Sequence, residues 1–178
     1  MCSVSNENIL IESNTNEITL ETKVKNKWKF YLHYCDEKNW DIDSYINVCE
    51  INNMKEAVLL SDYMCIDMLK RAMLFVMKDN IKPLWEDENN INGGCFSYKV
   101  PHKNLMKVWR LIYFSLILEN LSTNKTVNSS INGISLSPKK NFCIIKIWLS
   151  NCNTMDSDVI NKLESLPFEG CLFRKHSA

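Results

Sequence analysis

The pattern of apolar and polar positions predicts several short strands, the first beginning near residue 27. The segment KWKFYLHYC alternates, so that one face of a half-buried strand carries four large apolar side chains: Trp28, Phe30, Leu32 and Tyr34. The runs MLFVM and CFSYKV indicate two further buried strands, the second directly after the Gly93-Gly94 pair. Residues 1–24 are polar, and we predict a flexible tail there, followed by one domain over 25–178.

Helical spacing of apolar residues predicts three helices. The clearest spans 101–120, because seven apolar residues recur on one wide stripe: Leu105, Met106, Trp109, Ile112, Tyr113, Leu116 and Ile117. A first helix is expected over 54–64, and a last helix that starts from a cap at Asp156 or Ser157 and carries Val159, Ile160 and Leu163. The wide stripe predicts that the longest helix packs on a sheet.

A hairpin is predicted in INGISLSPKKNFCIIKIWLS, with its turn at 138–141. Alternation along its second strand assigns one set of side chains to the core: Cys143, Ile145, Ile147 and Leu149. The other set, Ile144, Lys146 and Trp148, faces a ligand or solvent. The end, GCLFRKHSA, is expected to form a short strand with basic residues. Strands and helices follow no strict alternation, which favours an α+β fold with an antiparallel sheet and helices on one face.

Composition narrows the class of protein. A length of 178 residues suits one domain, and no apolar run reaches the length of a membrane span. The start lacks a basic region followed by an apolar one, so we do not expect secretion. Eight cysteines without a CxxC pair predict reduced thiols in the cytoplasm or nucleus, with no zinc site or disulfide framework. Formal charge is zero, so an anionic partner requires a local basic patch.

Three tryptophans are not needed for the predicted core: Trp40 in a loop, Trp85 before an acidic run, and Trp148 on a strand. In the run WEDE, an indole packed on the core with solvated acids after it is the ordinary explanation. A functional one is that two indoles sandwich a flat cation, a carboxylate accepts two N–H bonds from its edge, and lysines hold attached phosphates. That combination describes a site for 7-methylguanosine triphosphate, the messenger RNA cap.

The segments NKWKFYLHYCDEKNW, IKPLWEDENNINGG and KIWLSNC resemble motifs of eukaryotic translation initiation factor 4E, from about Lys25 to the C-terminus. The resemblance implies a curved antiparallel sheet that cups the cap on its concave side, with three helices on the convex face. It also implies that Trp40 and Trp85 stack on the methylated base, that Glu86 pairs with the guanine edge, and that Trp148 lies near the N7-methyl group. No cofactor and no metal are expected.

The phosphate end departs from the family. Lys139 matches a basic family position, but Ile144 and Cys95 stand at two others. The candidate phosphate ligands in this chain are Lys139, Lys140, Lys146, Arg174 and Lys175.

The partner-binding dorsal face departs further, since Val58 replaces a family tryptophan. The residues expected on that face are Val24, Val58, Trp109 and Arg110. We therefore expect a scaffold like initiation factor 4G to bind through an altered interface.

Four functions compete at this point. The leading one is a non-enzymatic cap-binding protein that recruits messenger RNA for translation initiation in the cytoplasm, with the nucleus as a further location. The second is a cap-binding repressor or decoy that does not engage the usual scaffold, and the third is a protein adaptor. An enzyme is least expected, because Cys95 with His102 or His33 forms no ordered nucleophile-base motif. Richness in Asn, Lys and Ile suits an AT-rich gene of a parasite or large DNA virus, and in the viral case the location is the host cytoplasm.

Overall fold

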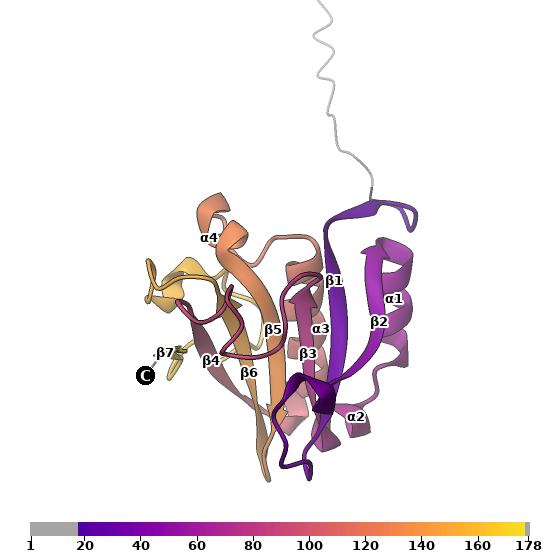
Figure 1. Cartoon of the computed structure of the whole chain (residues 1–178). Coiled ribbons are helices and arrows are strands. Elements are labelled where there is room, and N and C mark those ends of the chain that lie inside the picture. The colour runs from indigo at the N-terminus through magenta and orange to yellow at the C-terminus, as the bar shows by residue number, and fades with distance from the viewer. Residues whose placement is uncertain (1–17, 177–178) are drawn as a thin grey trace, which may run out of the picture.

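A computed structural model describes residues 18–176, which form a seven-stranded antiparallel sheet with helices packed on one side (Figure 1). The strands are β1 Lys23–Tyr34, β2 Ile46–Asn53, β3 Ala72–Lys78, β4 Gly94–Pro101, β5 Ile131–Pro138, β6 Phe142–Leu149 and β7 Leu172–Lys175. Their order across the sheet is β2-β1-β3-β5-β6-β4-β7. Strands β5 and β6 lie at the centre, so the predicted hairpin forms the middle of the molecule.

Three helices cover one face of the sheet: α1 Met54–Tyr63, α2 Ile66–Arg71 and α3 Leu105–Ile117. A fourth, α4 Lys125–Ser130, precedes β5 and packs on it. The stripe of α3 meets the sheet as its spacing predicts, and all of it is buried except the half-buried Met106. The main core lies between this helix layer and the sheet.

The opposite face of the sheet carries a second, smaller apolar cluster. Its buried members are Tyr31, Tyr45, Phe75, Met77, Ile81 and Trp148. Register explains why β6 serves both layers: Ile145 and Ile147 point into the helix-covered core, while Lys146 lies between Ser135 of β5 and Ser97 of β4 on the other face. Two connections, residues 35–45 and 79–93, cross in front of this second face (Figure 1).

The predicted α+β fold is confirmed, and the predicted strands, the hairpin and its turn are present, whereas strand β2 was not predicted. Some boundaries differ. The longest helix begins at Leu105 because a 3-10 turn, His102–Asn104, follows Pro101. On β1 the predicted apolar face holds for Trp28 and Phe30, whereas Tyr34 at the strand end is exposed.

The expected last helix is wrong. Asp156 does cap a turn, by accepting from the Asp158 amide, but that turn is a 3-10 turn over Ser157–Val159 and goes no further. Beyond it, the Asn161 amide donates to the Leu121 carbonyl instead of to its own segment. Ser165 has a positive φ of 64°. The chain here is tied to the loop after α3, and three helices still cover the sheet because α2 takes the place of the expected one.

The start of the domain lies slightly earlier than predicted. Strand β1 begins at Lys23, and the carbonyls of Leu20 and Thr22 accept bonds from the amides of Lys55 and Met54 at the start of α1. The rest of the predicted tail, residues 1–17, lies outside the described residues.

Candidate functional site

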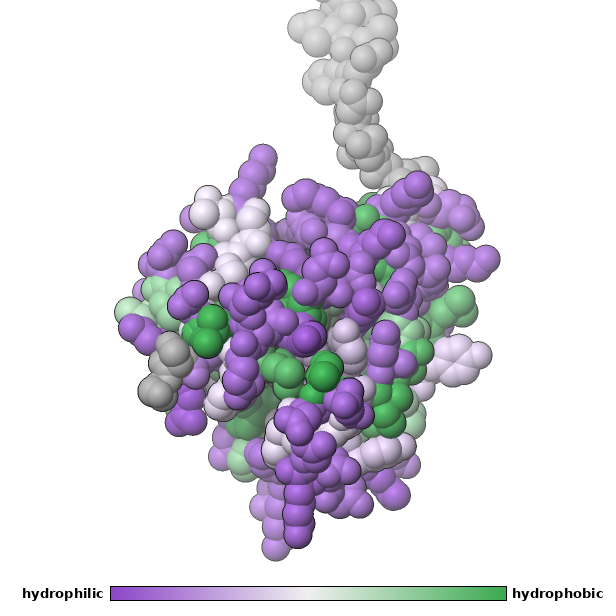
Figure 2. Space-filling view, in the orientation of Figure 1, coloured by the Kyte–Doolittle hydropathy of each residue, from purple (hydrophilic) through white to green (hydrophobic). Residues whose placement is uncertain are grey.

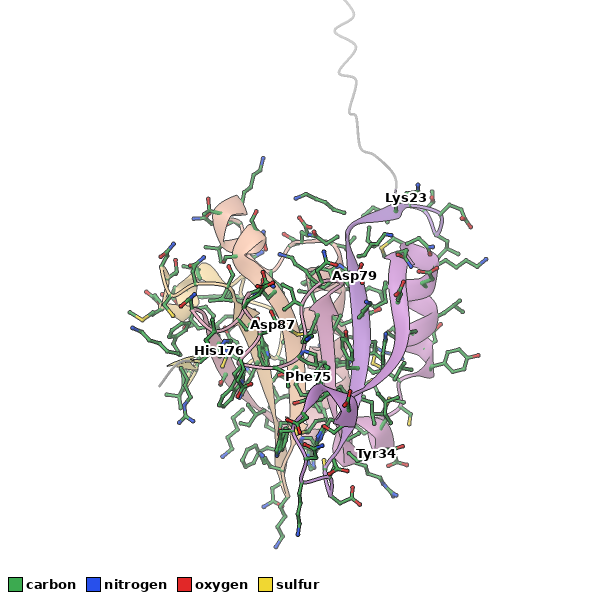
Figure 3. The ribbon with its side chains drawn as sticks, viewed as in Figure 1. Lys23, Tyr34, Phe75, Asp79, Asp87 and His176 are labelled. Carbon is green, nitrogen blue, oxygen red and sulfur yellow. The ribbon has the colours of Figure 1, made fainter. Side chains whose placement is uncertain are left out.

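Aromatic side chains form a continuous series of ring contacts across the open face of the sheet. In order, the neighbouring rings are Trp40, His33, Tyr45, Phe75, Trp148, His176 and Trp85. Figure 3 labels Phe75 near the middle of this face and His176 toward the β7 edge. Trp40 and Trp85 stand at the two ends of the series, and within residues 18–176 their rings do not contact each other directly.

Trp40 is presented by the connection between β1 and β2. Its indole lies 4.4 Å from the His33 imidazole, with the ring planes only 9° apart. His33 is buried on β1, and its Nε2–H donates to the Asn39 carbonyl at 2.9 Å. The imidazole therefore supports the indole and fixes the loop beside it. The Trp40 side chain is 53% exposed, so its other face is open to a ligand.

Trp85 lies in the connection between β3 and β4, which Asp87 holds together. The Asp87 carboxylate accepts from the Lys82 amide at 3.1 Å and from the Asn89 amide at 2.9 Å. The Asp87 carboxylate, next to Glu86 in the sequence, therefore holds the loop together. Glu86 and Glu88 are exposed, and neither carboxylate has a hydrogen-bond or ion-pair partner in the described part of the chain.

A buried amide supports the same loop from beneath. The Asn90 side chain donates to the carbonyls of Lys82 and Leu84, at 3.0 and 2.8 Å, and accepts from Asn132 of β5 at 3.0 Å. These bonds flank Trp85 and tie it to the centre of the sheet. Trp85 is 39% exposed, so its own packing buries only part of the ring. The bonds of Asn90 therefore help to hold the indole in position.

The charge of Glu86 acts on the open face. Burial raises the pKa of Tyr45 to about 12, and the Glu86 carboxylate adds to that rise. The same carboxylate partly counteracts the lowering of the His176 pKa, whose main cause is burial. The charge of Glu86 therefore acts on both Tyr45 and His176.

The end of β7 closes the site. The His176 amide donates to the Gly93 carbonyl at 3.0 Å, and its Nδ1–H donates to the Asn90 carbonyl at 2.8 Å. Its ring is nearly parallel to Trp85, with centroids 6.0 Å apart. Gly93 has to be glycine, because a Cβ atom there would lie 1.8 Å from the Leu149 carbonyl oxygen.

Trp148 forms the floor of the face. It points to the predicted side of β6 but is only 2% exposed, since His176 lies 4.8 Å away and Phe75 packs against it. Its Nε1–H donates to the Ser135 hydroxyl at 2.9 Å, which holds the indole flat against β5.

The predicted cations divide into two groups. Lys146 lies within the site, with its Nζ 4.9 Å above the Trp85 ring. Arg174 pairs in register with Cys95, the strand neighbour of Trp148 on β4. In contrast, the exposed Lys139 and Lys140 occupy the turn at the opposite end of β6 from Trp148. Lys175 is exposed on β7.

The predicted partner residues lie on the helix-covered side with unequal exposure. Arg110 is exposed, and Val24 and Val58 are half-buried. Trp109 is fully buried, with its Nε1–H directed to the Met64 sulfur at 3.1 Å, so it supports this face and cannot contact a partner directly. A cavity of about 180 Å³ on this side is lined by Ile18, residues 22–25, Met54 and residues 117–119.

Three supporting residues were missed by the sequence reasoning. His33 cannot serve as a base for Cys95, because three strands separate β1 from β4 in the sheet. Its position two residues after Tyr31 was the available signal, because alternation puts both on the open face. His176 was seen only as part of a basic end. Nothing in the sequence distinguishes Asn90 from the other asparagines of its loop.

Comparison with known proteins gives one family. The family model described as eukaryotic initiation factor 4E matches residues 23–167. Eukaryotic translation initiation factor 4E-2 of Schizosaccharomyces pombe is 35% identical over 85 residues, which are 47% of this chain and 33% of that protein. The homolog of this factor from Acanthamoeba polyphaga mimivirus is 24% identical over 136 residues, covering 65% of this chain and 50% of its own. The chain therefore spans half or less of the length of these curated relatives.

Solved structures agree in fold. Ascaris suum eIF4E-3 with the m7G cap superposes with a TM-score of 0.67 at 21% identity, covering 78% of each chain. C. elegans eIF4E-3, in complex with the 4E-binding protein Mextli and a cap analog, gives 0.68 at 18% identity over 77% of this chain and 79% of that one. No helix within residues 18–176 combines the length and apolar character needed to cross a lipid bilayer.

Proposed function

This chain belongs to the eukaryotic initiation factor 4E family, and from that membership we propose that it binds the 7-methylguanosine cap of messenger RNA and recruits that RNA for translation initiation in the cytoplasm. The observation that carries the proposal is the loop holding Trp85 and Glu86: its internal bonds use Asp87 and Asn90 and leave the Glu86 carboxylate free. It acts as a binding protein and performs no chemistry on the RNA.

The methylated base is proposed to lie between Trp40 and Trp85. Methylation at N7 gives the purine a delocalised positive charge, and a cation against an indole face gains about 1–2 kcal/mol when water is excluded. Trp40 has an open face, and His33 covers the other. The two indoles do not touch each other in the described part of the chain, as a sandwich around a base requires. Trp148, at the floor between them, lies where the N7-methyl group would rest.

Glu86 is proposed to read the edge of the base. Its carboxylate would accept from N1–H and from the exocyclic amine, a charge-assisted pair in which each bond contributes about 1.5–3 kcal/mol. Adenine lacks this pair of donors, so the same contact selects guanine. The free carboxylate described above is what such a contact needs.

The triphosphate is proposed to run along the cations beside β6. Lys146 and Arg174 stand nearest the tryptophans, and the neutral thiol of Cys95 lies between them because burial raises its pKa. Lys139 and Lys140 at the hairpin tip, and Lys175, are placed for phosphates farther along the RNA. The 4E-binding proteins in the related complexes suggest a protein partner for the helix-covered side, where Val24, Val58 and Arg110 are accessible.

A repressor that occupies caps without recruiting ribosomes is the second candidate. The observation favouring it is α1, whose accessible apolar side chains are Leu59 and Tyr63, with Val58 half-buried where the family presents a tryptophan. Recovery from cell extract of a scaffold that also binds a helicase supports the initiator, whereas recovery of silencing factors alone supports the repressor.

Two matched substitutions test the cap site. Glu86→Gln and Glu88→Gln remove the same charge from exposed positions two residues apart in one loop. On an immobilised 7-methyl-GTP column we expect the wild type and Glu88→Gln to be retained. Glu86→Gln should bind about ten- to a hundredfold more weakly, because it loses the charge from the edge contact. Equal retention of both variants would contradict the assignment of Glu86.

A further inference from the structure

Lys146 stands in an unusual place for a lysine. It projects from the centre of the sheet, two residues before Trp148, onto the open face, where it is half-buried. Its ammonium lies 4.9 Å above the centre of the Trp85 indole. Among residues 18–176 no carboxylate lies within ion-pair distance of it. The Trp85 indole is therefore a favourable neighbour for this half-buried charge.

The charged groups around Lys146 favour the entry of an anion. Burial lowers the pKa of Lys146, and the positive charge of Arg174 lowers it further. Between the two cations lies Cys95, which stays a neutral thiol because burial raises its pKa. An anion that entered between Lys146 and Arg174 would replace their repulsion with two attractions.

A cation over an indole is also the interaction that a methylated purine would make with Trp85. We propose that Lys146 occupies the ligand's place on Trp85 in the free protein and moves onto the ligand's phosphates when they arrive. Base stacking then depends on the phosphate chain. This inference rests on the proposed function, since it assumes that Trp85 stacks on a cationic base.

The two roles of Lys146 act on affinity in opposite directions. A methylated nucleoside without phosphates must displace the ammonium from the ring and offers it nothing in return. A nucleotide with its triphosphate displaces the same ammonium but provides a stronger partner. The device makes the site reject free methylated nucleosides and accept the same base at the end of a phosphate chain, as it occurs on capped RNA.

Binding of 7-methylguanosine and of 7-methyl-GTP, followed by tryptophan fluorescence, tests this proposal. Lys146→Met removes the charge but keeps an unbranched side chain, and Lys55→Met removes one charge from an exposed position of α1, on the opposite side of the sheet, as a control. We expect Lys146→Met to bind the nucleoside about threefold more tightly than the wild type and the triphosphate about tenfold more weakly. Lys55→Met should leave the binding of both ligands unchanged.

Lys146→Arg provides a second variant that keeps the cation. A guanidinium also lies over indoles and binds phosphate, so this variant should keep the wild-type ratio of the two affinities. If Lys146→Met weakens the triphosphate while nucleoside binding stays the same or falls, Lys146 is only a phosphate ligand and the proposal is wrong. If the wild type binds neither ligand, the cap-binding function itself fails.

Discussion

At the scale of single residues, each of the two loop indoles of the candidate site already lies beside a histidine ring. Trp40 rests on His33, and Trp85 lies parallel to His176. A ring held on one side loses less conformational freedom when a ligand binds on the other. Part of the entropy cost of ordering the side chain is then incurred during folding and not during binding. We therefore expect the histidines to support recognition without contacting the base.

His33 offers the clearest test of this support. His33→Ala should leave a gap under Trp40 and weaken 7-methyl-GTP binding by about three- to tenfold, which corresponds to the contribution of one aromatic pair. His33→Phe restores a flat ring but not the bond to the Asn39 carbonyl, so it should recover part of the lost affinity. Isothermal titration of the three proteins measures this. Equal affinities for the alanine and phenylalanine variants would show that the stack has no role in binding.

The residues proposed to contact the base come from the sequence, whereas those that hold them in place were not predicted. The run WEDE draws attention to Trp85 and its acids, and the resemblance to initiation factor 4E assigns Trp40, Trp85 and Glu86 to the base. The acid that closes the loop is the one with the shorter side chain: Asp87 accepts from the amide two residues on, as aspartates do in turns, and also from the Lys82 amide. The second of these bonds depends on the backbone path of the loop, which the sequence pattern does not reveal.

At the scale of elements, strand β7 and the Trp85 loop behave as one unit. Both bonds that join them involve His176, through its amide to Gly93 and its ring to Asn90. The aromatic ring also fills the space between Trp85 and Trp148. The last strand therefore contributes to the site by fixing a loop that begins almost a hundred residues earlier.

The pH dependence of stability tests this docking. Burial lowers the pKa of His176 below its ordinary value of 6.5, so the unfolded chain takes up a proton at a higher pH than the folded one. The free energy of unfolding should therefore fall as the pH drops below 6.5 towards the lowered pKa, and then level off.

The control for this measurement is His176→Gln, whose amide can still donate to the Asn90 carbonyl but does not titrate. Urea unfolding of both proteins on either side of pH 6.5 gives the comparison. The wild type should lose more stability than the variant over this interval. The same loss in both proteins would mean that His176 is not the group responsible.

Alternation predicted the strands well because β6 and β1 divide their side chains between a helix-covered core and an open face. The predicted last helix failed for a tertiary reason: the Asn161 amide donates to the loop after α3, and Val159, Ile160 and Leu163 pack on the main core from an irregular segment. The short helix α2 was not predicted, since one and a half turns carry too little periodicity to detect.

At the scale of the whole molecule, the two faces of the sheet have separate tasks. Figure 2 shows the open face as largely hydrophilic, with apolar side chains gathered near its middle. Because the formal net charge is zero, the cations around β6 are a local feature and not part of a general attraction for RNA. The helix-covered side carries the cavity and the exposed residues of α1, on which a partner would depend.

The central claim is that the site recognises a positively charged purine, and the affinities of the wild-type protein for 7-methyl-GTP and for GTP test it most directly. The two ligands share every phosphate and the same donors on the guanine edge, and they differ in the methyl group and the charge it confers. We expect isothermal titration to give at least about tenfold tighter binding of the methylated ligand. Equal affinities would contradict the account.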